Sequence, residues 1–279
     1  MITVFTTTYN RAYILEKLFY SLKDQTSKDF EWIVINDGST DGTSELFESW
    51  CAQDNGFPII YLEIPNGGKH RAINKGVKLA QSDAFFIVDS DDYLLPDAIE
   101  KAEQWFAQIA DDPEFAGISG LRGFSEADPI GGYGSFEGEY VDATNLEREK
   151  YNLLNDKAEI YKTSILRKYP FPEFEGENFI TEAVVWQQIA KEGYLIRWHN
   201  EVIYICDYLE DGLTKNANRR IMENPLGYAY YLAVLDSVYG AEKAGEARLN
   251  FYKALLKEYD QQKAFHLINI ANSMTIGNI

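Results

Sequence analysis

Three carboxylates lie within four consecutive residues, at Asp89, Asp91 and Asp92, directly after the apolar run 84–88. Like charges this close repel one another unless a cation neutralises them. Carboxylate oxygens are hard ligands that suit Mg²⁺ or Mn²⁺, and both ions also bind diphosphate oxygens. The structural alternative is the capping of a helix after Pro96, because a helix N-terminus favours negative charge. The cluster therefore predicts a divalent metal that carries a diphosphate, with helix capping left open.

The histidines and cysteines argue against zinc. His70, His199 and His266 are dispersed, and Cys51 and Cys206 form no closely spaced pair, whereas zinc sites usually draw on such residues at short spacings. Two cysteines also give no disulfide framework, which fits a reducing, cytoplasmic setting.

Polar clusters follow the other expected strands of the first hundred residues, at 7–11, 36–42 and 66–71. Ligands of open α/β sheets bind beyond the carboxyl ends of the strands, so we expect one site lined by all the clusters. Asp37 either accepts a hydrogen bond from a nucleobase N–H or simply forms the Asn-Asp-Gly turn. The chain has neither G-x-G-x-x-G nor a Walker A sequence, which disfavours dinucleotide binding and ATPase activity.

The elements that must position these clusters alternate along the chain. Apolar periodicity predicts strands over 2–8, 30–35, 58–64 and 84–88 and helices over 13–25, 43–52, 70–80 and 97–109. This order implies an α/β fold with a mostly parallel central sheet flanked by helices.

The pattern changes beyond residue 110. We expect a short strand over 115–119 within long loops, a helix over 181–193, strands over 194–198 and 202–206, and helices over 225–239, 241–259 and 261–272. The expected organisation is one domain over 1–217, with halves 1–110 and 111–217, and a C-terminal helical extension over 218–279.

Composition narrows the partners. The 279 residues are 46% apolar, enough for one large domain with an appendage. The net charge of −18 disfavours nucleic-acid binding. No signal peptide or transmembrane helix is expected. Residues 215–279 alone are net basic and rich in tyrosine. They are a candidate for peripheral contact with an anionic membrane at the inner face of the plasma membrane or with a lipid-linked acceptor, but a homodimer interface, a lid or an ordinary solvated face would give the same pattern.

Four segments together resemble glycosyltransferase family 2, whose members are inverting enzymes of the GT-A fold that build polysaccharides in bacteria. The opening run TTTYNR lies at 6–11, VINDGSTDGT at 34–43, NGGKHRAIN at 66–74 and the D-x-D run VDSDDYL at 88–94. The resemblance is good over residues 1–100 and patchy to about 217. It implies a transferase that moves a sugar from a nucleoside diphosphate donor, most readily a UDP-sugar, to a saccharide or lipid-linked saccharide with a divalent metal, Mn²⁺ or Mg²⁺.

The resemblance also assigns residues. Those implied to bind the nucleotide sugar are Thr7, Tyr9, Asp37, Lys69, Asn74, Asp89 and Ser90. Asp91 is the implied metal ligand. The family carries an acidic pair at the start of a later helix, one member being the base that accepts the acceptor's proton. Here that place reads Thr181-Glu182-Ala183, so Glu182 is the candidate, with Glu177 and Glu175 as alternatives and a helix-terminal acid as its structural interpretation.

Two other functions remain open on the residues alone. A sugar-1-phosphate nucleotidyltransferase would need a glycine-rich basic loop after the first strand, where this chain has Tyr9-Asn10-Arg11. A non-catalytic sugar-nucleotide binder would explain the altered acidic pair. Release of UDP from UDP-sugars distinguishes enzyme from binder.

Overall fold

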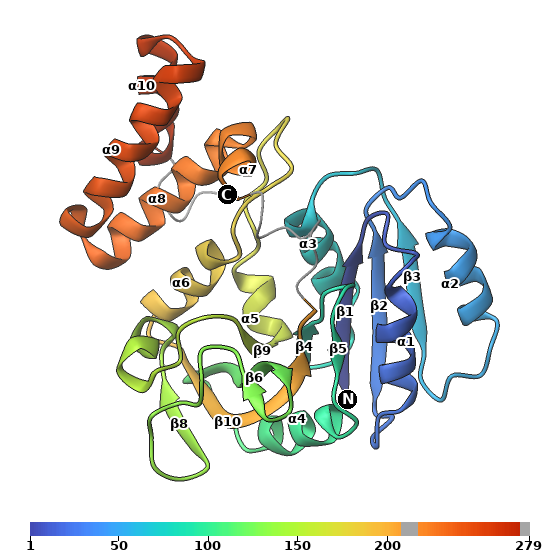
Figure 1. Ribbon diagram of the computed structural model, residues 1–279. Helices are drawn as coiled ribbons and strands as arrows, with labels where there is room; N and C mark the ends of the chain where they lie inside the picture. Colours follow the sequence, from blue (N-terminus) through green and yellow to red (C-terminus); the bar gives the residue numbers. More distant parts are fainter. Residues whose placement is uncertain (208–216, 274–279) are drawn as a thin grey trace.

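The structure is a computed structural model that describes residues 1–207 and 217–273. Its first part alternates strand and helix: β1 (Ile2–Thr8), α1 (Leu15–Lys23), β2 (Phe30–Asn36), α2 (Thr43–Cys51), β3 (Ile59–Glu63), α3 (Lys69–Leu79) and β4 (Ala84–Ile87). These strands pair in the order β3-β2-β1-β4, all parallel, as the alternation predicts. Their carboxyl ends therefore meet at one edge of the sheet (Figure 1).

The second part extends the same sheet. Its elements are β5 (Tyr93–Leu94), α4 (Ala98–Ala107), β6 (Phe115–Ser125), β7 (Asp128–Pro129), β8 (Tyr140–Ala143), the 3₁₀ helix η1 (Asn145–Tyr151), β9 (Lys157–Lys162), α5 (Thr163–Lys168), α6 (Ala183–Lys191) and β10 (Leu195–Ile205). The sheet continues β4-β9-β6-β10-β5. Antiparallel β9 lies between β4 and β6, so the parallel pairing of the first half becomes mixed here.

Alternate residues of the strands feed two hydrophobic cores, one on each face of the sheet. Along β2, Trp32 and Val34 pack into the core covered by α1, α2 and α4, whereas Ile33 and Ile35 pack into the core covered by α3, α5 and α6. This alternation is the period of two of a strand buried on both faces.

Four helices follow β10: α7 (Ala217–Glu223), α8 (Pro225–Tyr239), α9 (Ala241–Glu258) and α10 (Gln261–Ser273). They form the protrusion at the upper left of Figure 1. Helix α8 contributes Tyr230 and Val234 to the core beside α6, and Leu232 to a separate cluster with α9 and α10. The predicted extension is thus joined to the body through α8. No helix within the described residues is long and apolar enough to cross a membrane.

The strands of the second part of the sheet differ from the sequence expectations in three places. The strands expected over 194–198 and 202–206 are one strand, β10, which continues through a bulge between Trp198 and Val202. There the amide of Asn200 pairs with the backbone N–H and C=O of Gly134, at 2.6 and 2.9 Å, so polar residues interrupt the apolar pattern without ending the strand.

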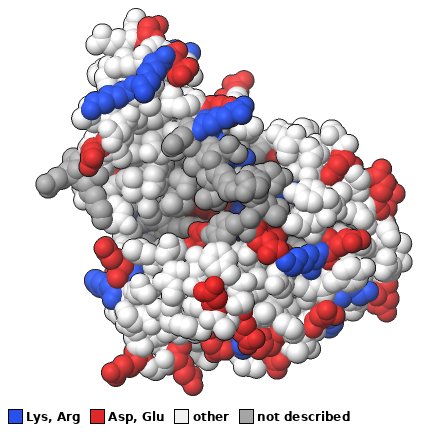
Figure 2. Space-filling view, in the orientation of Figure 1, with Lys and Arg blue, Asp and Glu red and all other residues white. Residues whose placement is uncertain are grey.

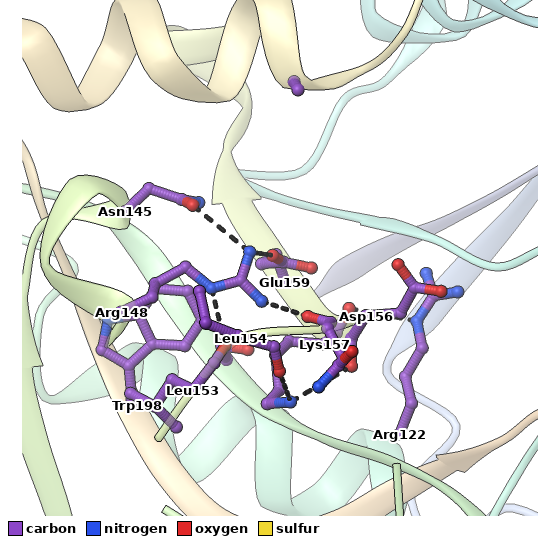
Figure 3. A network of polar contacts seen from close by, with 12 residues as sticks. Arg122, Asn145, Arg148, Leu153, Leu154, Asp156, Lys157, Glu159 and Trp198 are labelled. Carbon is purple, nitrogen blue, oxygen red and sulfur yellow. Dashed lines mark hydrogen bonds and ion pairs between the residues drawn. The ribbon is translucent and has the colours of Figure 1, made fainter. Parts of the chain in front are cut away.

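The strand expected over 115–119 extends to Ser125 as β6. Glycines suggested a loop beyond residue 119, but Gly120 lies where a Cβ would crowd the side chain of Ile203 in β10, 2.8 Å away, and its missing side chain lets the two strands pair closely. Strand β9 was not expected from the sequence, because the polar residues Lys157 and Glu159 interrupt its apolar pattern. In Figure 3, both side chains lie in a polar network with Arg148.

Candidate functional site

The loops after β1 and β2 are tied together at the carboxyl edge of the sheet. Asn10 has a positive φ of 54°, a conformation that asparagine tolerates better than most residues. Its backbone N–H donates to the Ser39 hydroxyl at 2.9 Å, and its side-chain oxygen accepts the N–H of Thr40 at 2.8 Å. Beside this tie, the Thr7 hydroxyl is buried without a hydrogen-bond partner among the described residues, and Tyr9 is 50% exposed. The Tyr9 side chain is therefore open to a ligand, whereas the Thr7 hydroxyl lies below the surface, and nucleotide binding by either residue stays a prediction.

Asp37 organises the loop after β3. Its carboxylate accepts the backbone N–H groups of Gly67 and Gly68, at 2.8 and 2.9 Å, and the Asn66 amide at 3.2 Å. Burial raises the pKa of Asp37, while these two backbone bonds oppose the rise. The structure therefore gives Asp37 a loop-holding role, and nucleobase binding by its remaining acceptor capacity stays a prediction.

Gly68 brings this loop against a distant segment. Its φ is +95°, and a Cβ there would overlap the carbonyl oxygen of Asn178. Only glycine permits both the backbone conformation and the close approach. The loop before α3 thus rests on the segment that leads to α6.

Asp89, the first acid of the D-x-D run, is held by two cations. Lys69 Nζ lies 2.5 Å from Oδ1, and Arg122 Nη1 lies 3.4 Å from Oδ2. Burial by itself would raise the pKa of Asp89, but Lys69 and Arg122 outweigh it and lower the pKa to about 2. Asp89 is therefore ionised at neutral pH.

The other two acids of the run differ from Asp89. Asp91 is partly buried and accepts no hydrogen bond from another residue in the described part of the chain; burial and then Asp89 raise its pKa. Asp92 is buried and accepts the Tyr204 hydroxyl at 2.7 Å and the N–H of Asp207 at 3.0 Å. Burial and the charge of Asp89 raise the pKa of Asp92 to about 7. Asp91 is thus the acid left open for a ligand, and Ser90 is buried between the acids.

Glu182 meets this cluster through Lys69. It lies at the N-terminus of α6, without a side-chain capping bond, and its Oε1 is 2.7 Å from the same Lys69 Nζ that binds Asp89. One ammonium group therefore joins the D-x-D run to the predicted base. The two carboxylates together raise the pKa of Lys69 against the effect of burial, so this cation is retained.

The alternative bases lie elsewhere. Both carboxylate oxygens of Glu177 accept backbone N–H groups at the start of α8, from Leu226 and Gly227, each at 2.7 Å. Glu175 is exposed. Glu182 is thus the member of the glutamate-rich stretch that contacts the cluster directly.

Asn74 is used in packing. Its amide donates to the Phe171 carbonyl and to Glu173, both at 2.9 Å, and its oxygen accepts the Phe171 N–H at 2.9 Å. The side chain anchors α3 to the segment before α6. Contact of Asn74 with the nucleotide stays a prediction.

Sequence reasoning missed two residues of the cluster. Arg122 comes from β6, and Tyr204 from β10, where its hydroxyl accepts the Asp89 N–H at 2.9 Å. The Arg122 guanidinium lies 4.1 Å above the Tyr204 ring. Figure 3 places Arg122 at the edge of the network that includes Lys157 and Glu159. An arginine and a tyrosine inside strands carry no motif, so no sequence signal could have identified them.

The donor set suits a hard divalent cation. Among residues 1–207 and 217–273, no group of three or more His, Cys, Asp or Glu side chains is arranged to hold a metal ion. Mg²⁺ is commonly held by only one or two carboxylates together with substrate phosphates. The open carboxylate of Asp91 beside the ionised Asp89 fits that mode of binding.

The comparisons with known proteins point to one family of enzymes. The profile described as glycosyl transferase family 2 matches residues 3–123. A Campylobacter jejuni protein named GalNAc(5)-diNAcBac-PP-undecaprenol beta-1,3-glucosyltransferase is 24% identical over 95% of this chain and 82% of its own length. Glycosyltransferase GlyA of Streptococcus pneumoniae is 35% identical over 39% of this chain and 16% of its own length. The chain aligns with between 16% and 47% of the length of GlyA and two Bacillus subtilis relatives.

Solved structures show the same fold. S. aureus TarS in complex with UDP-GlcNAc is 18% identical, with a TM-score of 0.63 over 97% of this chain and 71% of that chain. The mannosyltransferase PcManGT of Pyrobaculum calidifontis, in complex with GDP-Man and Mn²⁺, is 17% identical, with a TM-score of 0.57 over 99% of this chain and 87% of its own. The expected GT-A fold and the resemblance to family 2 are confirmed.

Proposed function

We propose that the protein, whose residues 3–123 match the profile of glycosyl transferase family 2, transfers a sugar from a nucleoside diphosphate donor, a UDP-sugar in the first instance, to a saccharide or lipid-linked saccharide, with inversion at the anomeric carbon. A divalent cation, Mn²⁺ or Mg²⁺, assists. The main support for this proposal is the position of Lys69 Nζ, which lies 2.5 Å from Asp89 and 2.7 Å from Glu182. The donor-side acid and the predicted base are thereby next to each other.

The donor side is built from the first half of the chain. The exposed Tyr9 ring is suited to hold the nucleoside by stacking, and Thr7 lies beside it at the end of β1. Asp37 keeps the glycine loop in place at this edge. Asp91 would hold the metal, which when bound neutralises charge on the leaving diphosphate.

The acceptor side places Glu182 as the base. The acceptor oxygen forms its bond to the anomeric carbon as the bond from that carbon to the diphosphate oxygen breaks. The acceptor's proton passes to the Glu182 carboxylate, and the nucleoside diphosphate leaves with the bonding electrons. Lys69 lowers the pKa of Asp89 and holds Glu182 at a fixed place beside the donor.

We propose a lipid-linked acceptor, because the Campylobacter jejuni relative that aligns over 95% of this chain is named as a glucosyltransferase of an undecaprenol-linked saccharide. The C-terminal helices offer a surface for a membrane. Leu249 and Leu256 of α9 and Phe265 of α10 are 51%, 42% and 61% exposed. Lys253 is exposed between the two leucines at helical spacing. Figure 2 shows Lys and Arg side chains interspersed with Asp and Glu side chains on the helices at the upper left of the molecule.

The activity test is incubation with a panel of nucleotide sugars with and without Mn²⁺. We expect metal-dependent release of UDP by slow hydrolysis, faster when a lipid-linked acceptor is added. A donor that raises the melting temperature without any release of nucleotide would make the protein a binder and contradict the proposal.

Flotation with anionic vesicles at low salt tests the membrane surface, with Leu249→Ser as its comparison. Absence of the wild-type protein from the floated fraction would refute membrane contact.

A further inference from the structure

The segment that carries Glu182 is anchored to the donor side through its backbone. Arg71 of α3 donates from Nη1 to the Glu177 carbonyl and from Nη2 to the Phe174 carbonyl, both at 2.5 Å. Gly68 rests against Asn178. These contacts fix the position of one side of the segment relative to the donor loop.

The other side is fixed by α8, through a reciprocal pair of side chains. The Glu177 carboxylate accepts the N–H groups of Leu226 and Gly227, each at 2.7 Å. In return, Asn224 Oδ1 accepts the N–H groups of Asn178 and Phe179, at 2.7 and 3.0 Å. Glu177 is 8% exposed and Asn224 is 2% exposed. We call Glu177 and Asn224 the clasp.

The clasp orders the segment and the helix together. The first N–H groups of a helix lack partners within it and are usually satisfied by a residue next to the helix. In α8 the acceptor comes from Glu177, 49 residues before Leu226. The N-terminus of α8 is therefore satisfied only while residue 177 stays where it is.

Helix α8 also touches the helix that Glu182 begins. Gln188 Nε2 of α6 donates to the Tyr230 hydroxyl at 2.8 Å, and Val185 of α6 shares a hydrophobic core with Tyr230 and Val234. Glu182 thus lies in the chain between two residues that contact α8. Glu177 of the clasp precedes it, and Gln188 follows it.

We propose that α8 positions the base: Glu177 and Asn224 are positioning residues for Glu182, and the C-terminal helices belong to the catalytic apparatus. This inference rests on the proposed function. The donor contacts at Asp37 and Asp89 do not pass through α8. Loosening the clasp therefore changes where Glu182 meets the acceptor and leaves the donor bound as before.

The test compares Asn224→Ala and Glu177→Gln with Glu192→Gln, a matched change at an exposed glutamate beyond the end of α6. We expect the clasp variants to lose tenfold or more in kcat for transfer, because a displacement of about 1 Å can cost about 10²-fold. Their Kd for UDP should stay close to that of wild type, because the contacts of Asp37 and Asp89 on the donor side do not involve the clasp residues. Asn224→Asp keeps the acceptor oxygen but loses the bond that the Asn224 amide donates to the Arg220 carbonyl at 2.8 Å, so it should recover kcat only in part.

Backbone hydrogen exchange provides a second readout. Amides of residues 177–182 should exchange faster in the clasp variants while those of β1 and β2 keep their protection. Should the clasp variants fail to fold, Tyr230→Phe, which removes only the hydroxyl bound by Gln188, should show a smaller fall in kcat at unchanged Kd. Unchanged kcat in the folded variants, or an equal loss in kcat and donor affinity, would overturn the inference. A wild-type protein without transfer would refute the proposed function instead, and the exchange pattern would still report on the clasp.

Discussion

Replacing Glu182 with glutamine tests the proposed base most directly. Glutamine has nearly the same shape and cannot accept the acceptor's proton at neutral pH. Loss of a positioned general base costs about 10²- to 10⁴-fold in rate, so transfer by Glu182→Gln should fall by at least about 10²-fold.

The structure indicates that this substitution leaves the fold and the donor site intact. Glu182 makes no side-chain capping bond to α6, so no helix cap is lost. Its ion pair with Lys69 is partly exposed, 32% and 23% at the two side chains. Pairs of this kind contribute about 1 kcal/mol or less to stability. Lys69 keeps its other partner, Asp89.

The assay measures transfer from a UDP-sugar and, separately, the Kd for UDP with Mn²⁺. Glu192→Gln is the control, since it makes the same substitution at an exposed glutamate near the opposite end of α6. We expect Kd to stay within about twofold of wild type because Lys69 and Asp89 remain paired. Wild-type transfer by Glu182→Gln would refute the assignment, and a large loss in Glu175→Gln instead would transfer the role to that residue.

Three further predictions concern other parts of the molecule. Asp91→Asn should abolish the rise in melting temperature that UDP with Mn²⁺ gives, without changing that of the free protein; an equal rise in both proteins would exclude Asp91 as the ligand. Burial lowers the pKa of Lys157 to about 8, so between pH 8 and about 10.5 the unfolded chain binds more protons than the folded protein. The unfolding free energy of wild type should therefore rise with pH relative to that of Lys157→Met, by up to about 1.4 kcal/mol per pH unit. Parallel pH curves of the two proteins in denaturant titrations would contradict this. Gly68→Ala should destabilise the protein by about 2 kcal/mol or more because it adds a clash with Asn178 to the strain of a positive φ; Gly176→Ala, at a φ of +77° with nothing within 4 Å, isolates the strain, and equal melting temperatures of the two variants would show that the clash is relieved freely.

Local sequence patterns determined the first half of the protein. The runs of β2 and β4 are apolar over almost their whole length because both faces of the sheet are covered, and polar residues begin where each strand ends. Parallel strands bring their carboxyl ends to one edge, so the positions of Thr7, Asp37 and Asp89 at that edge followed from the order of elements. The C-terminal helices were equally evident from periodicity, and α8 has the expected bounds.

Contacts between residues far apart in sequence decided the rest. Glu175, Glu177 and Glu182 are alike in sequence, and only the folded chain gives Glu177 to the N-terminus of α8 and Glu182 to Lys69. Asn74 lies in a motif expected to face the nucleotide, yet its amide binds a segment about a hundred residues later. Arg122 and Tyr204 reach the D-x-D run because β9 brings β6 and β10 onto the sheet that ends in it. Local propensity cannot encode these partnerships, because each depends on which strands pair and which helix packs on which face.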